Sequence, residues 1–99
     1  MTAYNVVRFR VKTGQDRVFL DAHKNMPLLD GMIEGSMVKT GERAYCLVGK
    51  WQSMDKIVAA RPKMICILDN MRGMLEDLGG GLGVTDAISG DSVMELHKG

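Results

Sequence analysis

Cysteines and long apolar runs are scarce in this chain, and each scarcity removes a class of protein. Two cysteines among 99 residues, Cys46 and Cys66, are too few for a disulfide framework and show no CxxC spacing. Reduced thiols in a cytoplasmic protein are therefore expected. No apolar run approaches the roughly 18 residues that span a bilayer, so we expect no membrane partner. Residues 1–11 also lack the basic flank, apolar core and cleavage site of a signal peptide.

The chain has no excess of charge of either sign. Its 13 Lys and Arg and 12 Asp and Glu give a net charge of +1, and the basic residues are scattered. A nucleic-acid binder carries a clustered basic surface, so we expect no nucleic-acid partner. We expect no metal either, because the two histidines, His23 and His97, lie far apart without paired ligand spacing.

The composition is otherwise that of one globular domain spanning residues 1–99. Hydrophobic residues make up 45% of the chain and charged residues 25%. Nine methionines stand against five aromatic residues. Methionine fills irregular gaps, so this excess indicates either a soft core or a pliable apolar pocket.

The first third of the chain predicts a strand and a helix. Residues 4–11 alternate in polarity, which predicts a strand. Thr13 and Asp16 have the spacing of a capping box at a helix start. Pro27 and Gly31 would close that helix.

A hairpin follows, formed by strands at residues 32–40 and 43–51 around a short turn. The second of these strands is apolar on both faces. One face carries Tyr45, Leu47 and Trp51, and the other carries Ala44, Cys46 and Val48. A strand that is apolar on both faces has to be covered twice. Two helices cover one face only, so the sequence predicts a homodimer through the open sheet face.

The remaining segments predict a long helix and a last strand. Ser53 is suited to cap the helix, and Pro62 would kink it or start a new one. Apolar residues at helical spacing continue to a terminating glycine at Gly79. Residues 79–90 are rich in glycine and follow a helix, so they predict a flexible connection or pocket lid rather than a phosphate-binding loop. Residues 92–96 are the expected last strand.

Four polar or aromatic side chains have both structural and functional interpretations. Asn5 lies on the strand face expected to meet the helices, where its amide must bond either backbone or a ligand. His23 is either a half-exposed boundary residue or a general base at a pocket rim. Trp51 is either a core anchor or a ligand contact. Arg61 is either a solvated cation or the partner of an anionic ligand group.

The order βαββαβ, the first strand YNVVRFRV and the segment YCLVGKWQSMD resemble the antibiotic biosynthesis monooxygenase-like family. The resemblance covers about residues 4–96. It implies an α+β, ferredoxin-like protomer with an antiparallel sheet, which pairs into a dimeric α/β barrel. Asn5 and Trp51 match the asparagine and tryptophan of the family's cleft. Haem-degrading members place a histidine about ten residues after the tryptophan, where this chain has Arg61 and Pro62, so haem binding is disfavoured.

Two functions remain open. In the first, the protein is a monooxygenase without metal or flavin, with Asn5, Trp51 and His23 as catalytic candidates. A small aromatic or quinol-type ligand would then lie between sheet and helices, and the candidate ligand contacts are Phe9, Arg61, Met64 and Leu68. In the second, the same dimer is a non-catalytic binding or accessory protein, because one fold hosts many functions. Neither function requires a cofactor.

Overall fold

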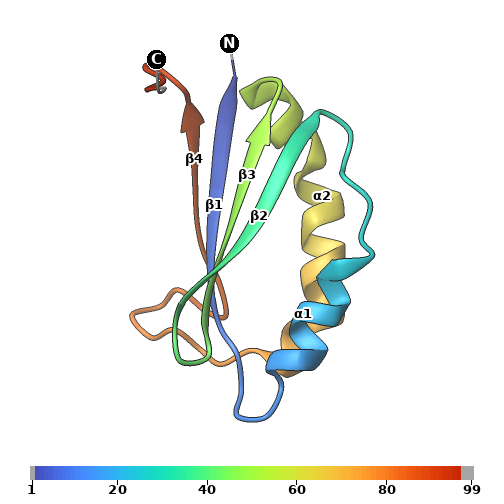
Figure 1. The fold of residues 1–99 in the computed structure, drawn as a ribbon, viewed down its shortest axis with the longest axis vertical. Coiled ribbons are helices and arrows are strands. Elements are labelled where there is room, and N and C mark those ends of the chain that lie inside the picture. The colour runs from blue at the N-terminus through green and yellow to red at the C-terminus, as the bar shows by residue number, and fades with distance from the viewer. Residues whose placement is uncertain (1, 97–99) are drawn as a thin grey trace.

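The computed structural model describes residues 2–96, which form one four-stranded sheet with both helices on one face (Figure 1). The elements in order are β1 (Ala3–Arg10), α1 (Asp16–Lys24), β2 (Met32–Gly41), β3 (Ala44–Trp51), α2 (Met54–Met71), a 3₁₀ turn (Arg72–Met74) and β4 (Asp86–Asp91). All strand pairs are antiparallel, in the order β2-β3-β1-β4. The predicted α+β ferredoxin-like fold is confirmed. None of these helices is long and apolar enough to cross a membrane.

The core consists of two buried clusters between the sheet and the helices. The larger one packs α1 on the sheet through Phe19, which is 5.3 Å from the rings of both Phe9 and Tyr45. The smaller one joins Ala3 and Trp51 to Ile57 of α2. The face assignments predicted for β1 and β3 are confirmed, because the helix-facing residues Phe9, Tyr45 and Trp51 are buried.

Helix α1 begins differently from the prediction, and it ends before Pro27, as predicted. Gly14 adopts a left-handed φ of 78°, so the helix starts at Asp16, with Gln15 at the cap and no side-chain cap bond. The predicted capping box is wrong, because the Asp16 carboxylate accepts a hydrogen bond from the Tyr45 hydroxyl instead. The helix ends at Lys24, before Gly31, since a proline disfavours helical conformation in the residue before it.

Helix α2 is capped as predicted but is shorter. The Ser53 side chain accepts a hydrogen bond from the backbone N–H of Lys56 at 3.3 Å. The helix continues through Pro62, so a new helix does not start there. It also ends at Met71 rather than near Gly79, because Leu75 bridges to Val11 and extends the sheet.

The last strand lies earlier in the chain than predicted. β4 is Asp86–Asp91, of which all but Asp91 lie inside the expected glycine-rich loop, and residues 92–96 form no strand. Asp91 already pairs with Ala3, the first residue of β1. Ser92 donates one more backbone hydrogen bond, to Thr2 at 2.9 Å, and beyond it the part of the chain that the structure describes offers no further partner on this side of β1, although the apolar pattern of residues 92–96 is stronger than that of β4. His97 lies outside the described residues.

The sheet face opposite the helices is covered by no element among residues 2–96. Its centre is apolar, with Val6 opposite both Val48 and Ile88 in the register, and Ile88 is 68% exposed. Arg8 on this face forms an ion pair with Asp86. The face has the apolar centre expected from the sequence.

Candidate functional site

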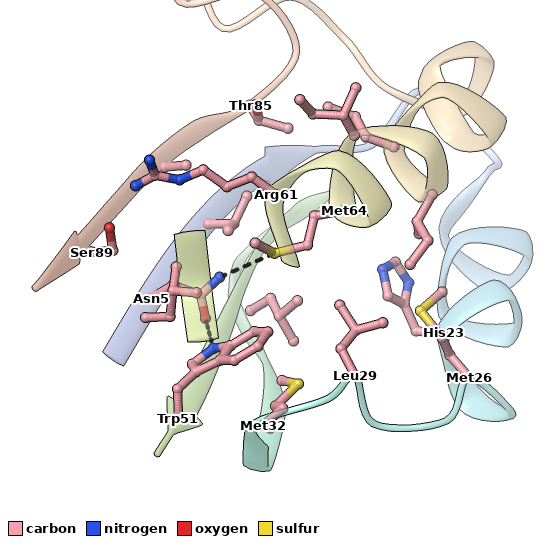
Figure 2. Close-up of a pocket in the computed structure, with 18 of the residues that line it drawn as sticks. Asn5, His23, Met26, Leu29, Met32, Trp51, Arg61, Met64, Thr85 and Ser89 are labelled. Carbon is pink, nitrogen blue, oxygen red and sulfur yellow. Dashed lines mark hydrogen bonds between the residues drawn. The ribbon is translucent and has the colours of Figure 1, made fainter. Parts of the chain in front are cut away.

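A cavity of about 560 Å³ lies between the sheet, α1 and α2. Its size is within the range of small-molecule sites, which is roughly 300–1,000 Å³. The structure brings all seven predicted site residues to this cavity: Asn5, Phe9, His23, Trp51, Arg61, Met64 and Leu68. They come from β1, β3, α1 and α2, so the cavity is built by the whole fold (Figure 2).

Asn5 and Trp51 form a buried hydrogen-bonded pair at the base of the cavity. The indole Nε1–H of Trp51 donates to Oδ1 of Asn5 over 2.7 Å. Trp51 is 1% exposed and Asn5 is 6% exposed. This bond fixes the orientation of the carboxamide, because an indole N–H can only donate. The amide nitrogen of Asn5 therefore faces the helix side, where its only described partner is the sulfur of Met64 at 3.9 Å (Figure 2). A thioether is a weak acceptor, so this N–H group is a donor suited to a ligand oxygen.

Gly49 makes room for this pair. It lies directly opposite Asn5 in the β1–β3 register. A Cβ at Gly49 would be 2.4 Å from Oδ1 of Asn5 and 2.9 Å from Nε1 of Trp51. The hydrogen bond thus crosses the strand through space that any other residue would fill.

The cavity floor near Asn5 is one cross-strand row of small or polar residues. Ser89 of β4 pairs with Asn5, Asn5 with Gly49, and Gly49 with Gly35 of β2. Directly opposed residues share a face of a sheet. Three members of this row, Ser89, Asn5 and Gly35, line the cavity. The row is therefore a shallow trough across the sheet.

His23 lines the cavity from the last turn of α1, across from Asn5 and Trp51 (Figure 2). Its Nδ1 lies 2.9 Å from the backbone oxygen of Phe19, and its ring is 4.7 Å from the Phe19 ring. Because a carbonyl oxygen only accepts, Nδ1 carries the proton of a neutral ring. That tautomer leaves Nε2 as the proton acceptor.

The α2 residues form the roof of the cavity. Met64 and Leu68 contribute apolar surface, and Arg61 extends its guanidinium towards β4 and Ser89 (Figure 2). Within residues 2–96 Arg61 forms no ion pair. The cation at this end of the cavity is therefore available to an anionic group.

Sequence reasoning missed the wall formed by β4 and the segment after α1. Ser89 falls within the loop that the sequence predicts at residues 79–90, because the last strand is predicted at residues 92–96 and not at Asp86–Asp91. Residues 26–29 line the cavity because the chain leaves α1 early, and Gly31 beyond them is tied to Gln52 through a backbone hydrogen bond of 2.8 Å. No local sequence pattern predicts that Gly35 lines the cavity, since its position opposite Gly49 depends on how β2 and β3 pair.

Solved structures with this fold include oxygenases. The chain aligns over 98% of its length with 98% of a mutant of SnoaB, a cofactor-independent oxygenase from Streptomyces nogalater, at 13% identity and a TM-score of 0.69. It aligns over 93% with 90% of a protein from Nitrosomonas europaea, provisionally assigned as an antibiotic biosynthesis monooxygenase, at 11% identity and a TM-score of 0.70. A mutant of MhuD with two manganese protoporphyrins bound is also similar, with 97% and 99% coverage, 13% identity and a TM-score of 0.58. No protein-family model and no curated protein matches the chain.

The comparisons establish the fold. The structural neighbours are proteins of the antibiotic biosynthesis monooxygenase type, as the resemblance in the sequence predicted. At such low identities the likeness does not extend to activity. The residues of α2 do not suit haem, because Met54–Met71 contains no histidine and its one cysteine, Cys66, does not line the cavity.

Proposed function

We propose that the protein binds a small aromatic or quinol-type ligand in the cavity and oxidises it with O₂, without metal or flavin. The observation that carries the proposal is the Asn5 carboxamide. Trp51 donates a hydrogen bond to the oxygen of this carboxamide, so the amide N–H group of Asn5 is turned towards the cavity, where its only described partner is the sulfur of Met64. A preorganised donor of this kind stabilises charge that develops on a substrate oxygen.

The chemistry requires an acidic, electron-rich ligand, because O₂ reacts slowly with neutral closed-shell carbon. Removal of a proton from an anthrone-type CH₂ group gives an anion, and electron transfer from it to O₂ forms a carbon–oxygen bond as a peroxide. Loss of water from the protonated peroxide leaves a carbonyl, so one O₂ converts CH₂ to C=O plus H₂O. Asn5 would stabilise the enolate oxygen throughout.

Two further residues support proton and charge handling. Nε2 of His23 is free to accept a proton, since Nδ1 is engaged by the Phe19 carbonyl. Arg61 can pair with an anionic group at the β4 end of the cavity. A ligand reaching both ends would be an extended, fused-ring molecule, because His23 lies across the cavity from Asn5 (Figure 2).

Oxygen consumption with anthrone tests the proposal. We expect turnover in the native protein and a loss of about a hundredfold or more in an Asn5→Ala, Trp51→Phe double variant, the scale seen when an oxyanion donor is removed. Asn70→Ala is the matched control, because Asn70 is an exposed asparagine of α2 outside the cavity. Turnover that survives in the double variant would show that Asn5 and Trp51 do not carry the reaction.

A non-catalytic binding protein is the second candidate. It is favoured by the hydrogen bond between Trp51 and the Asn5 oxygen, because a purely structural polar pair would form the same bond. Native mass spectrometry separates the two. A co-purified ligand that stays unchanged in air would support binding without oxidation, whereas its conversion would support the oxygenase.

The proposal includes a homodimer through the open sheet face and a cytoplasmic location. The apolar centre of that face, around Val6, Val48 and Ile88, supports self-association. The two cysteines are free, Cys46 half-buried and Cys66 exposed, which suits a reducing compartment.

A further inference from the structure

Two glycines face each other on the cavity side of the sheet, in the interior of adjacent strands. Gly35 of β2 pairs directly with Gly49 of β3. Each glycine in a strand interior costs stability relative to alanine, because a glycine loses more backbone freedom on folding. Two such costs at one point indicate that the backbone here has to be approached closely.

Met32 occupies the space that the missing side chain of Gly35 leaves, and it reaches the edge of the space over Gly49, which the Asn5–Trp51 bond crosses. A Cβ at Gly35 would be 2.7 Å from the Met32 methyl carbon, and a Cβ at Gly49 would be 3.0 Å from the same atom. The methyl group therefore lies in a hollow made by both glycines. Met32 pairs with Trp51 across the strands and lies next to its indole (Figure 2).

We propose that the floor at Gly35, beside the Asn5–Trp51 bond that covers Gly49, is a stacking subsite for a planar aromatic ring, and that Met32 fills it until a ligand displaces it. A strand backbone without a side chain is a flat surface that a ring can approach closely. A methionine is suited to the role of occupant, because it is unbranched and its torsions change at low cost. The subsite adjoins the amide of Asn5, so a ring lying there places its oxygen substituent within the trough.

This inference rests on the proposed ligand class but not on oxidation. It predicts that ligands with one ring bind without entering the subsite, whereas fused-ring ligands have to move Met32. The size of the preferred ligand is then set by Met32 and by the absence of a side chain at position 35.

Binding of two non-oxidisable probes tests the subsite. Anthraquinone-2-sulfonate is a planar tricycle, and benzenesulfonate carries the same anion on one ring. Quenching of the only tryptophan, Trp51, reports binding of each probe without any turnover. In Gly35→Ala we expect affinity for the tricycle to fall about tenfold or more, the scale set by one methyl group in a tight pocket. In Met32→Ala we expect the tricycle to bind severalfold more tightly, with benzenesulfonate unchanged in both variants.

The variants are designed to keep the fold intact. At Gly35 only the flexible end of Met32 obstructs a methyl group, so the melting temperature should not fall. Gly90→Ala is the control, because a Cβ there meets nothing within 4 Å. Gly49→Ala, by contrast, should disturb the Asn5–Trp51 bond and weaken both probes.

Three results would overturn the subsite. They are native affinity for the tricycle in Gly35→Ala, equal weakening of both probes in Met32→Ala, and no binding of the tricycle to either the native protein or Met32→Ala. Failure of the oxygenase proposal looks different: the probe pattern would hold while anthrone consumes no oxygen. Turnover of anthrone that is indifferent to Gly35→Ala would reject the subsite alone.

Discussion

The indole N–H of Trp51 and the carboxamide oxygen of Asn5 are 2.7 Å apart, joined by a buried hydrogen bond between the end of β3 and the start of β1. The bond stabilises the sheet at one end and orients the amide at the cavity. Both consequences arise from one contact, and they can be measured separately.

The stability of the pair is accessible through a double-mutant cycle. We expect Trp51→Phe and Asn5→Ala each to lower the free energy of unfolding by about 1–3 kcal/mol, because each leaves a buried polar group unpaired. The double variant should lose less than the sum, with a coupling of about 0.5–3 kcal/mol. Urea denaturation followed by far-ultraviolet circular dichroism is the measurement. Strictly additive losses would show that the bond contributes nothing.

Arg43, in the hairpin turn, has a left-handed φ of 59° and is the only non-glycine residue with positive φ among the described residues. Its guanidinium donates to the backbone oxygen of Val11 and pairs with Glu76. Arg43→Gly and Arg43→Ala both lose these contacts, but only alanine keeps the steric cost of this conformation. We therefore expect the glycine variant to be more stable than the alanine variant by about 1 kcal/mol. Urea midpoints test this, and equal midpoints would contradict it.

Tyr45 links β3 to the start of α1 and gives a pH dependence. The hydrogen bond to Asp16, then burial, then the Asp16 charge raise the pKa of the Tyr45 hydroxyl above its ordinary 10.0. A raised pKa means that the neutral form is favoured in the folded state. Its stabilising contribution is therefore full below pH 10.0 and is lost as pH rises through the folded-state value.

We expect absorbance at 295 nm to show one tyrosine ionising above pH 10.0 and to show this ionisation at lower pH in Asp16→Asn. Tyr45→Phe should lack the corresponding alkaline loss of stability. If the native protein and Tyr45→Phe lost stability identically above pH 10.0, the Tyr45–Asp16 bond would not be the cause.

The open sheet face predicts a dimer that one charge can disrupt. We expect light scattering at micromolar concentration to give twice the chain mass of 10.9 kDa. Val48→Lys should shift the protein to monomer, since a lysine at the centre of the face would be buried unpaired. Val58→Lys is the control, because Val58 is 49% exposed on α2. A native protein that is monomeric under these conditions would exclude the proposed assembly.

Alternation along β1 and β3 was enough to assign the buried faces, and hence to bring Asn5, Phe9 and Trp51 to one side of the sheet. The alternation could not predict the register of the sheet, because the register depends on which strands pair. The opposition of Gly35 to Gly49 therefore has no local signal. The predicted position of the last strand is wrong for a related reason: residues 92–96 are more strand-like locally, but β1 begins at Ala3, opposite Asp91, and only Ser92 bonds to the residue before it, Thr2.

The placement of β1 in the interior of the sheet has a consequence for biosynthesis. β1 leaves the ribosome before the other three strands of this sheet, yet its partner β4 follows all of them, and Arg8 and Asp86 are 78 positions apart. Long-range pairing of this kind is slow to form. The β2–β3 hairpin and α2 can thus assemble while the edge of β1 that pairs with β4 is still unpaired. The cavity wall that contains Ser89 therefore forms last.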